Sequence, residues 1–230
     1  MRLLLVMNGS RARYAGGADQ ARYETWLPYC GPGTKLEVGY LPDVQERYEF
    51  GTAQAATKHS VLYPDRVEQA EREGYDAVVM HCCSDPGLDE ARSRVAIPVI
   101  GPGEATLRAG AILGRRIGMT VPGTDSVAHH REQVRGLGLA DRVVGLEPID
   151  KPIGKYASQD PEAMTDALVA AAERLVARGA DVICPSGLAF IPVRVSAAEV
   201  SERIGVPVLD PALLSVRSAE TLHAARIGAR

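Results

Sequence analysis

Two stretches of this chain repeat one pattern, and this repeat restricts the fold more than any other feature. Residues 74–83 read GYDAVVMHCC and residues 179–188 read GADVICPSGL, so glycine falls on glycine and aspartate on aspartate. Each stretch is followed by a short helical pattern and an Ile/Val-Pro-Val strand, and upstream of each lies a strand that ends in a Gly-Ser or Gly-Thr turn. The shared order indicates an internal duplication.

The apolar runs within the repeats predict the fold class. Short runs such as Ala77–Met80 are typical of parallel strands that are buried on both faces, and helical patterns separate them along the chain. We therefore predict an α/β protein with two pseudo-symmetric parallel sheets. The N-terminal lobe is expected to comprise residues 1–100 together with 207–230, and the C-terminal lobe residues 101–206.

Composition excludes several classes of partner. The net charge is −3 and only 5% of the residues are aromatic, which argues against binding to nucleic acid or to an anionic membrane. The four cysteines form no CxxC pair, and the first apolar run, Leu3–Met7, is too short for a signal peptide or a membrane span. We expect a cytoplasmic protein whose partner is a small molecule.

The first repeat carries the main candidate for chemistry, Cys82. His81, Cys82, Cys83 and Ser84 follow a predicted strand, and Asp85-Pro86 resembles an N-cap with proline at the first helical position. Ligands of parallel sheets bind at this carboxyl end of the strands. Helix-terminal amides near a thiol lower its pKa, which favours a reactive thiolate. The alternative is that Cys82 and Cys83 are simply small buried residues.

The turns after the first strand of each half are candidate anchors for substrate. Asn8-Gly9-Ser10 and Gly123-Thr124 occupy matching places, where backbone N–H groups and a hydroxyl can face an anion. A nucleotide cofactor is not expected, because Thr106 replaces the third glycine of a dinucleotide motif and no P-loop occurs.

Two adjacent histidines, His129 and His130, lie in a predicted helix. Neighbouring residues of a helix point in different directions, so a shared metal site is not expected. We expect these histidines to lie on a solvated face, and we predict no metal site and no cofactor.

Several segments resemble the aspartate/glutamate/hydantoin racemase superfamily, and most of all its hydantoin and allantoin racemase branch. They are Cys82 with Asp85–Leu88, then Val99–Ala105, Leu113–Arg116, Gly136–Arg142 and Gly179–Ile183, in the same order and at similar spacing. The resemblance implies two flavodoxin/Rossmann-like lobes with the active site in the cleft between them. It also implies a cofactor-independent enzyme and a homo-oligomer, since dimers and larger assemblies are common among relatives.

Members of this family use one thiol from each lobe to move a proton at a carbon next to a carbonyl. The resemblance assigns the first thiol to Cys82, whereas the position of the second thiol is occupied by Gly187. Cys184 is expected inside a strand, and Ser186 is a poor base unless something activates it. Loss of the second thiol is also expected to open space for a larger substituent. The predicted substrate-binding residues are Asn8, Ser10, Cys83, Ser84, Gly123, Thr124, Ser186, Gly187 and Leu188.

Three hypotheses for function follow. The first is a racemase-like isomerase that acts on a hydantoin-like or amino-acid-like substrate, with Cys82 as the proton-transfer residue but without symmetric two-thiol chemistry. The second is a one-thiol decarboxylase of a malonate-like acid, since the resemblance extends to arylmalonate decarboxylase, which keeps a single thiol. The third is a non-catalytic homologue that binds a small molecule.

Overall fold

The computed structural model describes residues 1–14, 16–42, 53–149 and 160–225, and for residues 53–58 it describes the backbone alone. The segments 43–52 and 150–159 lie outside the described residues. The sequence pattern assigns no element to residues 43–63, and the structure describes this stretch only from Ala53 onward. Within the described residues, no helix is both long and apolar enough to cross a membrane.

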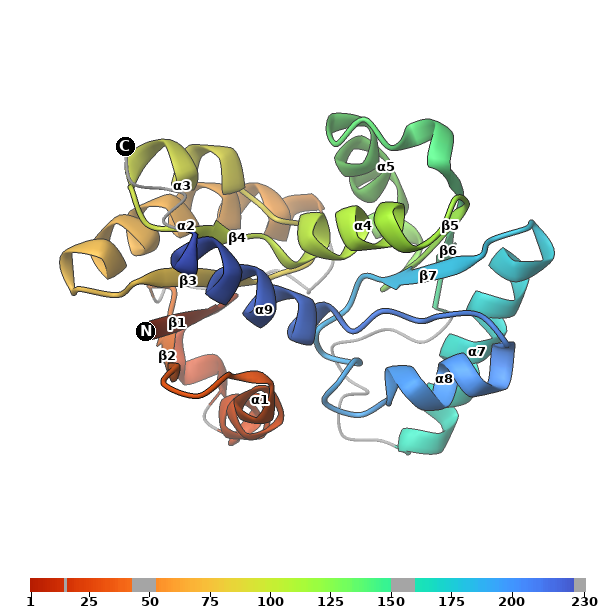
Figure 1. Ribbon diagram of the computed structural model, residues 1–230, viewed down its shortest axis with the longest axis horizontal. Helices are drawn as coiled ribbons and strands as arrows, with labels where there is room; N and C mark the ends of the chain where they lie inside the picture. The colour runs from red at the N-terminus through yellow and green to blue at the C-terminus, as the bar shows by residue number, and fades with distance from the viewer. Residues whose placement is uncertain (15, 43–52, 150–159, 226–230) are drawn as a thin grey trace.

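Two parallel sheets form the framework, as predicted (Figure 1). The first sheet has the order β2-β1-β3-β4 and the second has the order β6-β5-β7. In each sheet, the first strand in sequence therefore lies between the second and the third. The strands of the first sheet are β1 (Arg2–Met7), β2 (Lys35–Tyr40), β3 (Ala77–His81) and β4 (Val99–Ile100). Those of the second are β5 (Ile117–Val121), β6 (Val143–Pro148) and β7 (Val182–Pro185).

The duplication extends to individual hydrogen bonds. Asp76 accepts a hydrogen bond from the backbone N–H of Arg2, and Asp181 accepts bonds from the N–H groups of Arg115 and Arg116. Each aspartate therefore ties the start of a repeat strand to the start of the first strand of its own sheet. The glycine two residues before each aspartate has a positive φ, 78° for Gly74 and 88° for Gly179, which side chains other than glycine rarely tolerate.

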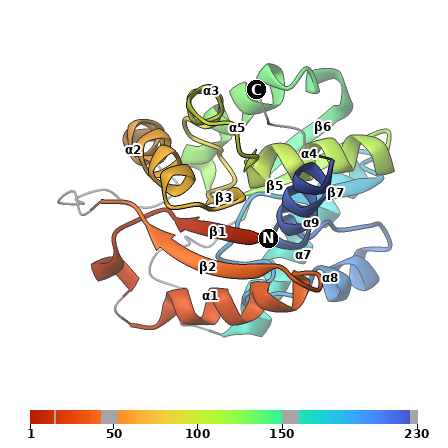
Figure 2. The same cartoon turned by 60° about the vertical axis from the view of Figure 1, so that its left-hand side comes forward.

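Helices cover both faces of each sheet (Figures 1 and 2). The helices that follow the strands of the first half are α1 (Ala18–Trp26), α2 (Ala53–Arg72), α3 (Leu88–Arg94) and α4 (Pro102–Leu113). Those of the second half are α5 (Val127–Gly136), α7 (Pro161–Ala177), α8 (Ala197–Ile204) and α9 (Pro211–Ala224). Short 3-10 turns at Arg11–Tyr14, Leu27–Tyr29, Thr124–Ser126 and Ala140–Arg142 complete the connections.

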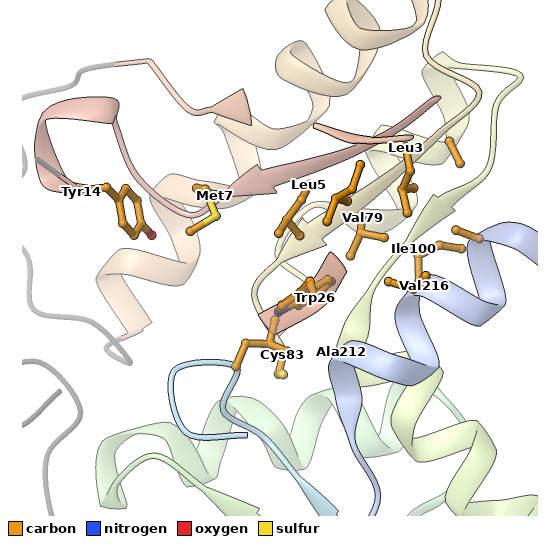
Figure 3. Packing of buried hydrophobic residues seen from close by; sticks show 14 residues of the cluster. Leu3, Leu5, Met7, Tyr14, Trp26, Val79, Cys83, Ile100, Ala212 and Val216 are labelled. Atoms are coloured by element: carbon orange, nitrogen blue, oxygen red, sulfur yellow. The ribbon is translucent and has the colours of Figure 1, made fainter. Parts of the chain in front are cut away.

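The last helix returns to the first sheet. Ala212 and Val216 of α9 belong to the same buried cluster as Leu3, Leu5 and Val79, as Figure 3 shows. Before α9 begins, Val208 forms an isolated parallel bridge with Ile183 in the second sheet. The lobe boundaries at residues 100 and 207 stay predictions.

Alternation along β3 sends neighbouring side chains to opposite faces of the first sheet. Val79 and Cys83 belong to the cluster beneath α9, whereas Met80 and Cys82 pack with the cluster that includes Tyr63 of α2. The two adjacent thiols therefore face different surroundings.

Candidate active site

The carboxyl ends of β1 and β3 meet at the point where the strand order of the first sheet reverses, which is where ligands of open α/β sheets bind. Met7 pairs with His81 at the end of these strands, so Asn8 and Ser10 follow one strand while Cys82 and Ser84 follow the other. The side chain of Asn8 accepts a hydrogen bond of 2.6 Å from Tyr14, and Ser10 is buried.

Cys82 is half-buried, so solvent reaches part of this residue. Its sulfur lies 3.1 Å from the hydroxyl of Ser84. Burial raises the pKa of the Cys82 thiol, although the hydrogen bond with Ser84 acts in the opposite direction. The site therefore favours the neutral thiol, and the lowered pKa expected from helix-terminal amides is not found.

Asp85 does not cap the helix that follows it. Helix α3 begins later, at Leu88, with Gly87 as its N-cap. The carboxylate of Asp85 instead accepts hydrogen bonds of 3.0 and 2.6 Å from the N–H groups of Gly103 and Glu104, at the start of α4. Burial raises the pKa of Asp85 to about 7, against the effect of these donors, and the charge of Asp85 adds to the rise in the pKa of Cys82.

Cys83 connects this loop to the second repeat. The backbone N–H groups of Gly187 and Leu188 face the buried Cys83 sulfur, but burial still holds its pKa well above the ordinary value. Leu188 packs in the same cluster as Cys83 and Trp26, and Figure 3 shows Cys83 beside Trp26. The predicted substrate-binding residue Cys83 of the first repeat therefore contacts Gly187 and Leu188 of the second.

The space beside Gly187 is filled, contrary to the expectation that it is open. A Cβ atom built on Gly187 would lie 2.6 Å from Cδ2 of Phe190 and 3.2 Å from Cε2 of the same ring. Phe190 is 4% exposed, so its ring is part of the packed interior. An aromatic ring occupies the place where a second thiol would begin.

Cys184 does not serve as a second thiol either. It lies in β7, 1% exposed, and its sulfur is 3.5 Å from the carbonyl oxygen of Thr106 in α4. Burial raises its pKa to about 12. These contacts agree with the prediction that Cys184 is a strand residue.

His130 was expected on a solvated face, and the structure corrects this. His130 is 2% exposed, and its Nε2 lies 2.9 Å from the hydroxyl of buried Ser186. The neighbouring His129 is half-buried, with its Nε2 3.2 Å from the carbonyl oxygen of Ser84. The signal was present in the sequence, because His130 shares the helical spacing of Val127 and Val134 and so belongs to the inward stripe of α5.

Gly123 and Thr124 lie just beyond the end of β5, and their predicted role remains a prediction. Thr124 is exposed at the start of a 3-10 turn, and the carbonyl oxygen of Gly123 accepts a hydrogen bond of 2.7 Å from the hydroxyl of Ser126. Neither residue is held in place by a described hydrogen bond from the other lobe.

The structure also shows a group of buried polar atoms around Trp26 and His81, which the sequence analysis did not identify. The rings of Trp26 and His81 lie 5.6 Å apart, and Trp26 Nε1 and both ring nitrogens of His81 have no hydrogen-bond partner among the described residues. Nε of Arg22 is also without a described partner; burial lowers the pKa of Arg22, and the charge of Arg194 lowers it further. The N–H groups of Trp26 and Arg22 are suited to a carbonyl or carboxylate oxygen.

Comparison with models of protein families identifies the family of this chain. The family model described as Asp/Glu/Hydantoin racemase matches residues 21–219. The chain belongs to this family. Its relatives include members of the hydantoin and allantoin branch.

Two curated relatives are hydantoin racemases. The protein from Paenarthrobacter aurescens is 30% identical over 173 residues, which cover 74% of this chain and 70% of that protein. The protein from Rhizobium meliloti is 30% identical over 193 residues, covering 82% and 76% of the two chains.

Solved structures share the fold. Allantoin racemase from Pseudomonas fluorescens superposes with a TM-score of 0.87 at 22% identity and covers all of this chain and 94% of its own. A liganded variant of arylmalonate decarboxylase with one glycine-to-cysteine and one cysteine-to-serine substitution gives a TM-score of 0.69 at 19% identity, with 96% and 92% covered. At these identities the likeness establishes the fold alone.

Proposed function

We propose that this protein is a cofactor-independent, racemase-like isomerase in which Cys82 transfers a proton at a carbon next to a carbonyl. The observation that supports it most is the half-buried thiol of Cys82 at the carboxyl end of β3, beside the point where the strand order reverses. Membership of the racemase family supports the same class of reaction, and the hydantoin racemase relatives point to a hydantoin-like or amino-acid-like substrate.

The electrostatics of Cys82 favour proton donation from the resting enzyme. Burial raises the pKa of this thiol, so at neutral pH it holds its proton. When the thiol gives the proton to a carbanion, the hydroxyl of Ser84 at 3.1 Å is placed to stabilise the thiolate that remains. Proton donors positioned in this way contribute about 100- to 10,000-fold to rate.

The polar group near Trp26 supports binding of an oxygen-rich substrate. Arg22 and Arg194 supply positive charge, and Trp26 Nε1 offers a buried donor without a described protein partner. Such donors stabilise the negative charge that develops on a carbonyl oxygen when the neighbouring carbon loses its proton.

A second candidate is a decarboxylase of a malonate-like acid, because such an enzyme needs only one thiol. Loss of CO₂ leaves an enediolate, and the Cys82 thiol then protonates it from one face. The similarity to an arylmalonate decarboxylase variant and the occupation of the second thiol position by Phe190 favour this alternative.

Deuterium labelling separates the two candidates. The protein is incubated in D₂O with each enantiomer of 5-benzylhydantoin and of allantoin, and separately with 2-methyl-2-phenylmalonate. An isomerase introduces deuterium at the α carbon and inverts the hydantoin or allantoin enantiomers, whereas a decarboxylase releases CO₂ and one α-deuterated enantiomer of 2-phenylpropionate. NMR and chiral chromatography read both outcomes.

The role of Cys82 is tested with Cys82→Ala and with Cys184→Ala as the matched control. We expect Cys82→Ala to reduce turnover by about 100- to 10,000-fold. Cys184→Ala removes a more deeply buried thiol that packs against Thr106 of α4, and it should keep most of the activity. A Cys82→Ala variant that turns over within a few-fold of wild type refutes the assignment.

A further inference from the structure

Ser186 is the first residue of a chain of hydrogen bonds that runs from the second repeat to the Cys82 loop. Its hydroxyl oxygen lies 2.9 Å from Nε2 of His130, and Nδ1 of His130 lies 2.9 Å from Oε1 of Gln133. Nε2 of Gln133 donates to the carbonyl oxygen of Cys83 at 2.8 Å and to the Asp85 carboxylate at 2.9 Å.

The acceptors of Gln133 determine which nitrogen of His130 carries the proton. Both partners of Gln133 Nε2 are oxygen acceptors, so its amide nitrogen must face the Cys82 loop and its oxygen must face His130. An amide oxygen only accepts, and therefore Nδ1 of His130 holds the hydrogen. The lone pair of Nε2 is then free to accept the hydroxyl hydrogen of Ser186.

We propose that Ser186, with His130 as its base, is the second proton-transfer group of the site and replaces the absent thiol of the second lobe. This inference rests on the proposed isomerase function. Ser186 precedes Gly187, whose N–H faces the sulfur of Cys83, so the hydroxyl lies in the loop that contacts the loop of Cys82.

The proton transfers balance over one turnover. The Ser186 oxygen takes the α proton of the substrate while the Ser186 hydroxyl hydrogen passes to Nε2 of His130. The substrate becomes an enolate, and the Cys82 thiol delivers its own proton to the opposite face of the same carbon. The cycle leaves a Cys82 thiolate and a protonated His130, and either exchange with solvent or turnover of the opposite enantiomer restores the initial state.

The surroundings of both groups favour the starting state of this cycle. Burial and, to a smaller extent, the charge of His129, whose ring lies 5.6 Å away, lower the pKa of His130 to about 4. The hydrogen bond to Gln133 acts in the opposite direction. His130 is therefore neutral at pH 7 and able to accept a proton, while burial keeps Cys82 in the thiol form that can donate one.

The same chain of hydrogen bonds also fixes the loop of Cys82 relative to the loop of Ser186. Gln133 contacts the Cys83 carbonyl and Asp85 on one side and His130 on the other, so a single side chain of α5 positions both proton-transfer groups. The charged and titratable groups that face His130 along this path are His129 of α5 and, through Gln133, Asp85 of the first lobe.

Deuterium exchange followed for each enantiomer tests the role of Ser186. The probes are both enantiomers of 5-benzylhydantoin and of allantoin in D₂O, with wild type, Ser186→Ala, His130→Gln and Cys82→Ala. Ser215→Ala serves as the control, because Ser215 is a buried serine of α9 whose hydroxyl donates a hydrogen bond to the carbonyl oxygen of Pro211 in the same helix.

We expect Ser186→Ala to lose at least 100-fold in racemisation while one enantiomer still exchanges its α hydrogen with retention, through Cys82 alone. Cys82→Ala should show the complementary pattern, with exchange confined to the other enantiomer. We expect an acid limb near pH 4 in the wild-type pH profile, where His130 takes up a proton. His130→Gln should match Ser186→Ala near neutral pH, and its remaining exchange should lack this limb. Selective exchange in one enantiomer also shows that the variant is folded.

The outcomes that overturn the inference are distinct from those that overturn the proposed function. Racemisation by Ser186→Ala within a few-fold of wild type, together with loss in Cys82→Ala, refutes the role of Ser186 alone. Absence of exchange in wild type with every probe refutes both. Independently of substrate, nitrogen NMR should find the hydrogen of His130 on Nδ1; a hydrogen on Nε2 contradicts the proposal, because Ser186 then has no base.

Discussion

The packing of Phe190 against Gly187 predicts an energetic coupling that can be measured. A glycine whose φ is not in the left-handed region is ordinarily stabilised by replacement with alanine, by about 0.4–1 kcal/mol, because the unfolded chain loses freedom. At Gly187 the added Cβ would lie 2.6 Å from the buried ring of Phe190. The loss of freedom in the unfolded chain stabilises the variant and the steric conflict with Phe190 destabilises it. We expect the steric conflict to have the larger effect on the free energy of unfolding.

The magnitude follows from the packing around the ring. Because Phe190 is 4% exposed, the ring cannot move into solvent, and overpacking of this kind costs about 1–3 kcal/mol. Subtraction of the unfolded-state gain leaves Gly187→Ala less stable than wild type by up to about 2.6 kcal/mol. For a chain of this size, this corresponds to a melting temperature up to about 10 °C lower.

A double-mutant cycle with Phe190→Leu is the assay. The smaller side chain removes the atoms nearest to the new Cβ, so Gly187→Ala should be neutral or stabilising in the Phe190→Leu background. The coupling energy from urea denaturation should be about 1–3 kcal/mol. Gly136→Ala is the control, because a Cβ at Gly136, at the end of α5, meets no atom within 4 Å and should not destabilise.

Two results would refute the reasoning about Gly187. One is stabilisation of the wild-type background by Gly187→Ala, and the other is additivity of the two substitutions. Either result means that the ring does not occupy the place of the missing thiol.

Three further predictions follow from the site. Burial lowers the pKa of His81 to about 3. The contribution of His81 to the free energy of unfolding should therefore fall by about 1.4 kcal/mol per pH unit as pH drops from 6.5 towards 3. Urea melts at several pH values should show that His81→Gln removes this contribution. Because burial raises the pKa of Asp85 to about 7, the free energy of unfolding should lose a contribution from this carboxyl as pH rises from about 4 through about 7; Asp85→Asn should remove that contribution, and an unchanged pH dependence contradicts this. Arg22→Met should raise KM about 10- to 100-fold for a substrate that carries a carbonyl or carboxylate, and steady-state kinetics with an unchanged KM would exclude Arg22 from binding.

The internal repeat by itself determines much of the fold. Paired Gly74/Gly179 and Asp76/Asp181 predict the same turn and the same strand start twice, and the structure shows the corresponding hydrogen bonds in both halves. Such features are local, since glycine conformation, strand patterns and turn residues act over a few positions of the chain. The place of Cys82 at the end of a parallel strand follows from the same local information.

The chemistry of the site depends on contacts between residues far apart in sequence. Ser186 and His130 are separated by 56 positions, and Gln133 reaches Asp85 across 48. No local pattern shows that such residues meet, because their proximity arises from the packing of α5 between the two loops. The state of the Cys82 thiol is likewise decided by tertiary structure, because burial, which raises the pKa of a thiol, is a property of the folded chain.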